Sequence, residues 1–153
     1  MLAKTLSISL FGLTGRIIEV ETDISSNLPA FVLVGLPDAS VNEAAARVRA
    51  AATNSKLPLP GRRITVNLSP ASVPKQGSSF DLAIAVSVLS ASGYFPNSRI
   101  EGTVFYGELA LDGRIKPVIG VLAAVVAAKQ LGIETIVIPA SNLNEVSRVS
   151  GIQ

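Results

Sequence analysis

The chain has 153 residues, of which 48% are hydrophobic but only 5% aromatic, so we expect one globular domain with a core of Val, Ile, Leu and Ala. It contains neither cysteine nor histidine, which excludes disulfides, Cys/His metal sites and any catalytic triad with an imidazole base. No apolar run reaches the roughly 18 residues of a membrane helix, and the first residues lack a signal-peptide pattern. We therefore expect a cytoplasmic protein without a membrane partner, and the sequence offers no metal site.

The net charge of +2 is unevenly distributed along the chain. Residues 44–80 contain six of the 13 basic side chains and none of the 11 acidic ones. Such a segment indicates a surface that faces a polyanion, although a merely solvated surface is the simpler alternative. The six basic residues are Arg47, Arg49, Lys56, Arg62, Arg63 and Lys75.

The first third of the chain alternates between predicted strands and a predicted helix. Polar and apolar residues alternate over 4–11 and 16–24, which predicts two strands joined by a turn. The continuous apolar run 30–36 predicts a more central strand. The motif SVNE at 40–43 has the pattern of a capping box, so we expect Ser40 to begin a helix that ends near Thr53.

The remainder predicts further alternation within a single domain of residues 1–153. Prolines in 57–61 separate the first helix from a strand at 62–69, and Asp112-Gly113 predicts a two-residue type I′ hairpin turn. The other expected elements are a buried helix ending at Gly93, an Ala-rich helix ending at Gly132, a strand at 134–140 and a last short helix capped by Ser141 or Asn142. This order predicts a two-layer α/β domain.

The stretch PKQGSSFDLAIA, which begins at Pro74, places two serines where a helix begins. Ser79 could be a nucleophile if a lysine or a carboxylate served as its base, and the turn at Gly77 could bind a phosphate. The chain has no Gly-Lys dipeptide and therefore no P-loop of the form GxxxxGK[ST]. The simplest interpretation is that Ser78 or Ser79 caps the helix.

Three long blocks carry a resemblance to a known family: VGLPDASVNEAAARVRAA, PGRRITVNLSPASVPKQGSSFDLAIAVSVL and FYGELALDGRIKPVIGVLAAVVAA. In order and spacing, over roughly residues 2–150, they resemble the N-terminal domain of the magnesium-chelatase-related ComM/YifB family of AAA+ ATPases. The resemblance implies a Lon-protease-like α/β (α+β two-layer) domain of the ribosomal-protein type that GHMP kinases share, with helices on one side of the sheet. It also implies that a hexameric AAA+ motor, which would bind ATP and Mg, follows in the full-length protein.

Comparison with Lon bears on catalysis. Lon's motif PKDGPSAG matches the serine loop and places the nucleophile on Ser79, whereas the block beginning at Gly107 places Lon's catalytic lysine on Leu122. A leucine cannot accept a proton. Lys129 lies two helical turns further on, and neither Lys116 nor Lys75 is at the position of a base, so the resemblance implies a vestigial site.

The sequence thus predicts a domain without catalytic residues or cofactors of its own. The family's implication in DNA branch migration, recombination and natural transformation makes DNA contact and ring assembly the leading hypothesis, with the six basic residues of 44–80 as candidates for binding DNA. Three alternatives stay open: a Ser-dependent peptidase with an unconventional base, a phosphate- or nucleotide-binding domain, and a scaffold that only assembles the ring.

Overall fold

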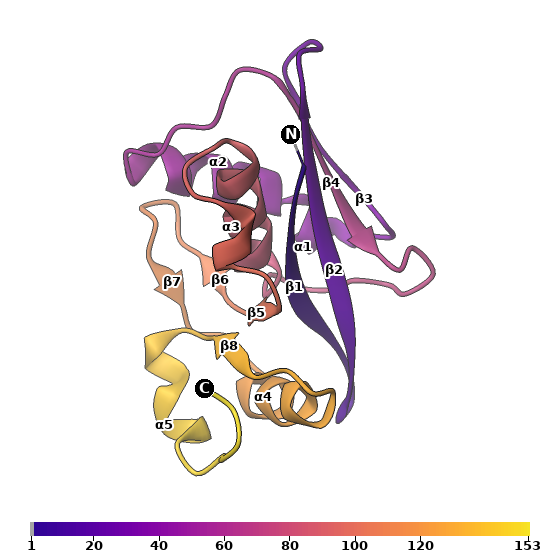
Figure 1. Ribbon diagram of the computed structural model, residues 1–153, viewed down its shortest axis with the longest axis vertical. Helices are drawn as coiled ribbons and strands as arrows, with labels where there is room; N and C mark the ends of the chain where they lie inside the picture. The colour runs from indigo at the N-terminus through magenta and orange to yellow at the C-terminus, as the bar shows by residue number, and fades with distance from the viewer. Residues whose placement is uncertain (1) are drawn as a thin grey trace.

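A computed structural model describes residues 2–153 and shows one six-stranded mixed sheet in the order β3-β4-β2-β1-β5-β8 (Figure 1). β1 and β4 each run antiparallel to β2, whereas the pairs β3/β4, β1/β5 and β5/β8 are parallel. The strands are β1 (Leu2–Phe11), β2 (Thr14–Ser25), β3 (Ala30–Val34), β4 (Arg63–Ser69), β5 (Thr103–Phe105) and β8 (Thr135–Val137). The expected mixed α/β fold is confirmed.

Helices α2 and α3 pack together on one face of this sheet (Figure 1). Their contact with the sheet is built from buried aliphatic side chains such as Val20 of β2, Val48 of α2 and Ile84 of α3. The helices are α1 (Ala39–Asn42), α2 (Ala44–Asn54), α3 (Asp81–Ala91), α4 (Val121–Gln130) and α5 (Leu143–Val146), with short 3-10 turns η1 (Asn97–Arg99) and η2 (Ala140–Asn142). None of the helices within residues 2–153 combines the length and the hydrophobicity needed to span a membrane.

The side chains of β1 alternate between two different neighbours. The hydroxyls of Thr5 and Ser7 donate to the carbonyls of Ala83 in α3 and Phe105, at 2.8 and 2.9 Å. The side chain of Ile8, the residue after Ser7, packs instead in a cluster with Ala128 of α4. Because successive side chains of a strand point to opposite faces, α4 covers the face opposite to α3 near the β1–β2 turn. The expected arrangement, with helices on one side of the sheet, therefore holds for α2 and α3. It does not hold for α4, which covers the other side.

Two local expectations are corrected by the structure. Strand β3 lies at an edge of the sheet, not in its centre, and none of its residues is fully buried. The first helix is capped by Asp38, whose Oδ1 accepts from the backbone N–H of Val41 at 2.7 Å, and Ser40 lies inside α1. The aspartate has the extended backbone of an N-cap, so the helix begins two residues earlier than the SVNE motif predicted.

The hairpin at Asp112-Gly113 exists but has a different turn. Its strands are β6 (Glu108–Leu109) and β7 (Ile115–Lys116). The N–H of Ala110 donates to the carbonyl of Arg114 at 2.9 Å, and the N–H of Gly113 donates to the carbonyl of Ala110 at 3.0 Å. This is a three-residue loop with the glycine at φ +96°, not a two-residue type I′ turn.

Candidate functional site

The serine loop is held by a buried lysine. Lys75 has no exposed surface, and its Nζ donates to the backbone carbonyls of Gly35, at 2.6 Å, and Pro70. The backbone of Lys75 also pairs with Leu36 and Asp38, so the loop is joined to the connection between β3 and α1. Burial lowers the pKa of the Lys75 ammonium. The ammonium group of Lys75 thus binds backbone carbonyls inside the domain. It does not lie on the surface, where the sequence had predicted contact with DNA.

Each serine of the loop has a side-chain partner, and neither caps helix α3. The Ser78 hydroxyl donates to Oε2 of Glu108 at 2.8 Å, and the side chain of Ser79 interacts with the Tyr106 phenol. Helix α3 has Phe80 at its N-cap position and no side-chain capping bond, so the expected serine cap is wrong. Burial raises the pKa of Tyr106, and its interaction with Ser79 opposes that shift.

These two serines line a cavity of about 560 Å³ between the loop, strand β1 and the segment that enters α4. Its other walls are mainly apolar side chains of β1 and of residues 117–120. Glu108 and Tyr106 are the titratable side chains that line it, and the lining contains no lysine within residues 2–153. Sequence reasoning had missed both residues, although each lies in the FYGEL block that carries the family resemblance.

The residues weighed as a base for Ser79 lie elsewhere. Leu122 is outside the cavity lining and 45% exposed on α4. Lys116 forms a 3.5 Å ion pair with Oε1 of Glu108, whose other oxygen accepts from Ser78. Lys129 lies at the C-terminal end of α4, close to Gly151. The cavity therefore presents two serines with a glutamate and a tyrosine rather than a serine with a lysine.

Arg47 belongs to an internal ion pair. Its Nε and Nη2 donate to Oδ2 and Oδ1 of Asp81 at 2.6 and 2.9 Å, and Nη2 also donates to the carbonyl of Ser40. The Arg47 side chain is only 16% exposed. Burial raises the pKa of Asp81, and Arg47 together with the N–H of Leu109 opposes that rise. Arg47 thus joins α2 to α3 and, like Lys75, faces away from the surface.

Three of the remaining candidates gather where β3 and β4 begin. Arg63 pairs with Ala30 of β3, and the carbonyl of Arg62 accepts from the N–H of Ala30 at 3.5 Å. The Arg49 guanidinium lies 5.8 Å from the centre of the Phe31 ring, the next residue of β3. We call Arg49, Arg62 and Arg63 the arginine surface. Lys56 is exposed beyond the end of α2 and is not part of it.

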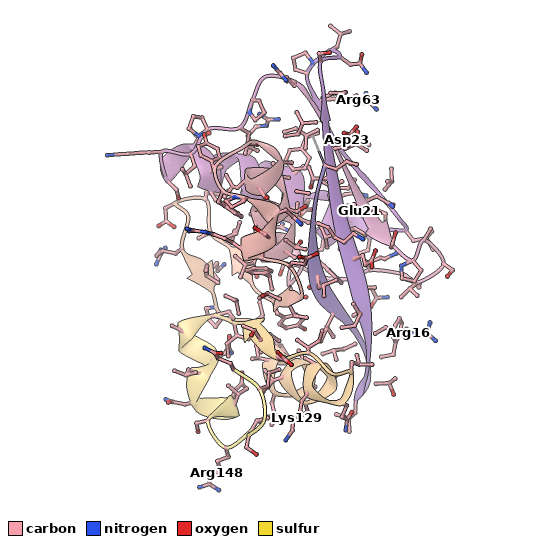
Figure 2. The ribbon with its side chains drawn as sticks, in the orientation of Figure 1. Arg16, Glu21, Asp23, Arg63, Lys129 and Arg148 are labelled. Carbon is pink, nitrogen blue, oxygen red and sulfur yellow. The ribbon has the colours of Figure 1, made fainter. Side chains whose placement is uncertain are left out.

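The arginine surface lies at one end of the sheet. Figure 2 labels Arg63 near the upper end, with Asp23 on the neighbouring strand beside it. Arg63 alternates with the buried Ile64 and so faces the side of the sheet opposite to α2, whereas Arg49 lies on the α2 side. Arg49 and Arg62 are exposed and Arg63 is half-buried, so the cluster wraps around the edge formed by β3.

Fold and cavity together are those of a Lon-like α/β domain. Over residues 20–142 the sequence matches the family described as subunit ChlI of Mg-chelatase, and the chain belongs to that family. The expected relationship to the ComM/YifB proteins and to Lon is confirmed by the relatives below.

The relatives cover nearly the whole of this chain. An uncharacterised protein of Mycobacterium tuberculosis is 52% identical over 151 residues, which are 99% of this chain and 30% of that protein. The competence protein ComM of Haemophilus influenzae is 42% identical over 97% of this chain and 29% of its own length. Lon protease 2 of Herpetosiphon aurantiacus is 31% identical over 88% of this chain and 17% of its own length. The chain thus spans less than a third of these relatives.

Proposed function

We propose that this chain is the DNA-contacting and assembly domain of a ComM-like AAA+ ATPase that acts in DNA branch migration during recombination, and that it has no catalytic activity of its own. The observation that carries the proposal is the arginine surface, in which Arg62 and Arg63 lie at the start of β4 beside Ala30, and Arg49 lies over Phe31 of the edge strand β3. Similarity to the competence protein ComM supports a role in competence, and we propose DNA as the polyanion that this surface contacts. ATP and Mg would bind to the motor part of the parent protein.

The positive charge of the arginine surface suits a nucleic acid that is bound through its phosphate backbone. Arginine donates paired hydrogen bonds to phosphate oxygens without reading the bases. Stacking on Phe31 holds the Arg49 guanidinium at the surface, and Arg63 is fixed by strand pairing on both sides. Asp23 beside Arg63 reduces the local positive potential, so we expect moderate affinity with a strong dependence on salt.

The proposal that the domain is catalytically silent is supported by the surroundings of Ser79. Ser79 lies beside Tyr106, whose pKa is raised by burial, and a neutral phenol is a poor base at neutral pH. Glu108 accepts from Ser78 and pairs with Lys116. These contacts support a Ser79 that lacks an effective general base.

DNA binding is tested by two charge-matched double variants of the 153-residue chain. Arg62→Ala/Arg63→Ala removes two arginines of the arginine surface, and Arg16→Ala/Arg148→Ala removes two exposed arginines remote from it (Figure 2). Fluorescence anisotropy with labelled duplex and forked DNA is measured across a salt series. The first variant should bind DNA more weakly. If both arginines neutralise phosphates, the slope of log K against log salt concentration should also become shallower by about 1.8. Equal affinities of the two variants would refute the assignment of the arginine surface.

The cavity beside Ser79 keeps a serine peptidase as the second candidate function. A fluorophosphonate probe labels an activated serine, and Ser78→Ala is the matched control for Ser79→Ala because both serines line the cavity. We expect no labelling of the native chain under conditions that label an active serine hydrolase. Labelling that survives in Ser78→Ala but disappears in Ser79→Ala would establish a peptidase-like site instead.

A further inference from the structure

The loop between β2 and β3 presents a leucine to solvent. Residues 26–29 are all exposed, and the side chain of Leu28 is 86% exposed. Figure 1 shows this loop at the upper end of the long axis, away from α4, α5 and the C-terminus. Such exposure contributes nothing to the core, so the fold does not account for an apolar residue here.

The register of the sheet places this loop over the arginine surface. Arg63 is the partner of Ser25, the last residue of β2, and of Ala30, the first residue of β3. The four loop residues connect these two partners, and neighbouring strands lie about 4.8 Å apart, so the loop arches over the point where the chain enters β4. Arg62 is exposed at that point. Leu28 therefore projects from a loop whose base is flanked by Arg62 and Arg63.

A comparison with Leu13 shows how Leu28 differs from an ordinary exposed leucine. Leu13 lies in the turn between β1 and β2, at the other end of the same hairpin, and is also 86% exposed. Single exposed leucines are common on protein surfaces and need no function. What distinguishes Leu28 is an apolar tip beside two arginines, followed by Pro29, whose ring restricts the backbone of the loop.

We propose that Leu28 is an apolar wedge that packs against the terminal base pair at a DNA fork or branch point while Arg62 and Arg63 hold the adjoining phosphates. The inference rests on the proposed function and adds the kind of DNA that the surface recognises. Proteins that deform DNA insert Leu, Ile, Met, Phe or Pro side chains between base steps and anchor the backbone with basic residues. Phosphate contacts supply affinity for any DNA, and the wedge adds preference for a junction, where one face of the last base pair is already unstacked.

The test compares Leu28→Ala with Leu13→Ala in the 153-residue chain. The probes are a fork with two unpaired arms, carrying 2-aminopurine in the last base pair, and a blunt duplex of the same paired sequence. Native protein and Leu13→Ala should bind the fork more tightly and raise the 2-aminopurine fluorescence as the base unstacks. Leu28→Ala should bind the blunt duplex as before but lose about tenfold in affinity for the fork, together with the fluorescence change. Leu28→Met should retain both.

The outcomes separate this inference from the proposed function. Native protein that binds neither DNA would overturn both. Native protein that binds DNA, with Leu28→Ala keeping the native preference for the fork, would overturn the wedge alone. An equal loss in Leu13→Ala would overturn it as well, because the effect would not depend on the arginine surface. A Leu28→Ala variant that changes self-association in sedimentation but not fork binding would assign the loop to contact with a second copy. Circular dichroism confirms that each variant is folded.

Discussion

The guanidinium of Arg47 and the carboxylate of Asp81 form a bidentate ion pair that joins helix α2 to helix α3, with Nε and Oδ2 2.6 Å apart. Asp81 has no exposed surface, and its Oδ2 also accepts from the backbone N–H of Leu109 in the β6–β7 hairpin. One carboxylate thus connects three elements beneath the serine loop.

Arg47→Ala should destabilise the fold strongly, because it leaves the Asp81 carboxylate buried without its cation. Removing one partner of a buried pair costs about 3 kcal/mol or more of unfolding free energy. The measurement is urea unfolding at pH 7. The control is Arg49→Ala on the same helix, where the loss of an exposed contact with Phe31 should cost about 0.5–1 kcal/mol. Equal midpoints for the two variants would show that the Arg47–Asp81 pair is unimportant for stability.

The penalty in Arg47→Ala should also depend on pH. Burial already raises the pKa of Asp81 above its ordinary 3.8, and removing the cation raises it further. A folded state that holds the proton more tightly than the unfolded state loses stability as pH rises through that pKa. The difference in unfolding free energy between native protein and variant should therefore be smaller near pH 4 than at pH 7. A penalty that is constant with pH would contradict this cause.

Lys75→Met should destabilise the domain without changing its affinity for DNA. The variant keeps most of the buried volume but leaves the carbonyls of Gly35 and Pro70 without the ammonium donor, which costs about 1–3 kcal/mol. Urea unfolding measures that cost, and anisotropy with duplex DNA is measured well below the unfolding transition. A folded Lys75→Met variant with a reduced salt slope would return Lys75 to the DNA-binding set.

Tyr106→Phe should reduce the amount of unfolding free energy that the protein loses as the pH rises into the alkaline range. Burial raises the pKa of Tyr106 above its ordinary 10.0, so between that value and the folded pKa the unfolded tyrosine is ionised while the folded one is neutral. The native protein consequently loses stability as pH rises through this window. Unfolding free energies are compared over about pH 9 to 11 in a Tyr94→Phe background, which leaves Tyr106 as the single tyrosine. Parallel curves with and without Tyr106 would rule out this contribution.

Leu122→Glu should prevent self-association of the domain. Leu122 and Val126 are exposed one turn apart on α4, and Ile119 is exposed just before the helix begins, so together they form an apolar surface of the kind that an assembly interface covers. Sedimentation velocity should show a concentration-dependent oligomer for the native chain and a monomer for Leu122→Glu. The control is Leu143→Glu, since Leu143 is exposed on the neighbouring α5. An oligomer that Leu122→Glu leaves intact would move the interface away from this face.

Much of the fold was predictable from local pattern. Alternation gave the long β1–β2 hairpin to within a few residues, and helical spacing located α2, α3 and α4. The same alternation could not say which face of β1 is buried. Thr5, Ser7 and Ser9 point inward, where α3 and nearby carbonyls satisfy their hydroxyls. Local sequence does not contain those distant acceptors.

Arg47 and Arg49 show where the candidate site could not be predicted. They are two residues apart on α2, and both fall outside its apolar stripe in the sequence. Only the packing of α3 against α2 brings Asp81, 34 residues later, to Arg47 and leaves Arg49 exposed. Lys75 differs from Arg62 for the same reason, because its carbonyl partners belong to separate loops.

The order of the elements, the position of the serine loop and the absence of histidine and cysteine all follow from the amino-acid sequence alone. These are properties of single residues and of short periodic segments. Only the folded arrangement makes β3 an edge strand, brings Ser79 beside Tyr106, and places Arg62 and Arg63 at the base of the loop that carries Leu28. Those relationships depend on strand order and helix packing, which bring together residues that are far apart along the chain.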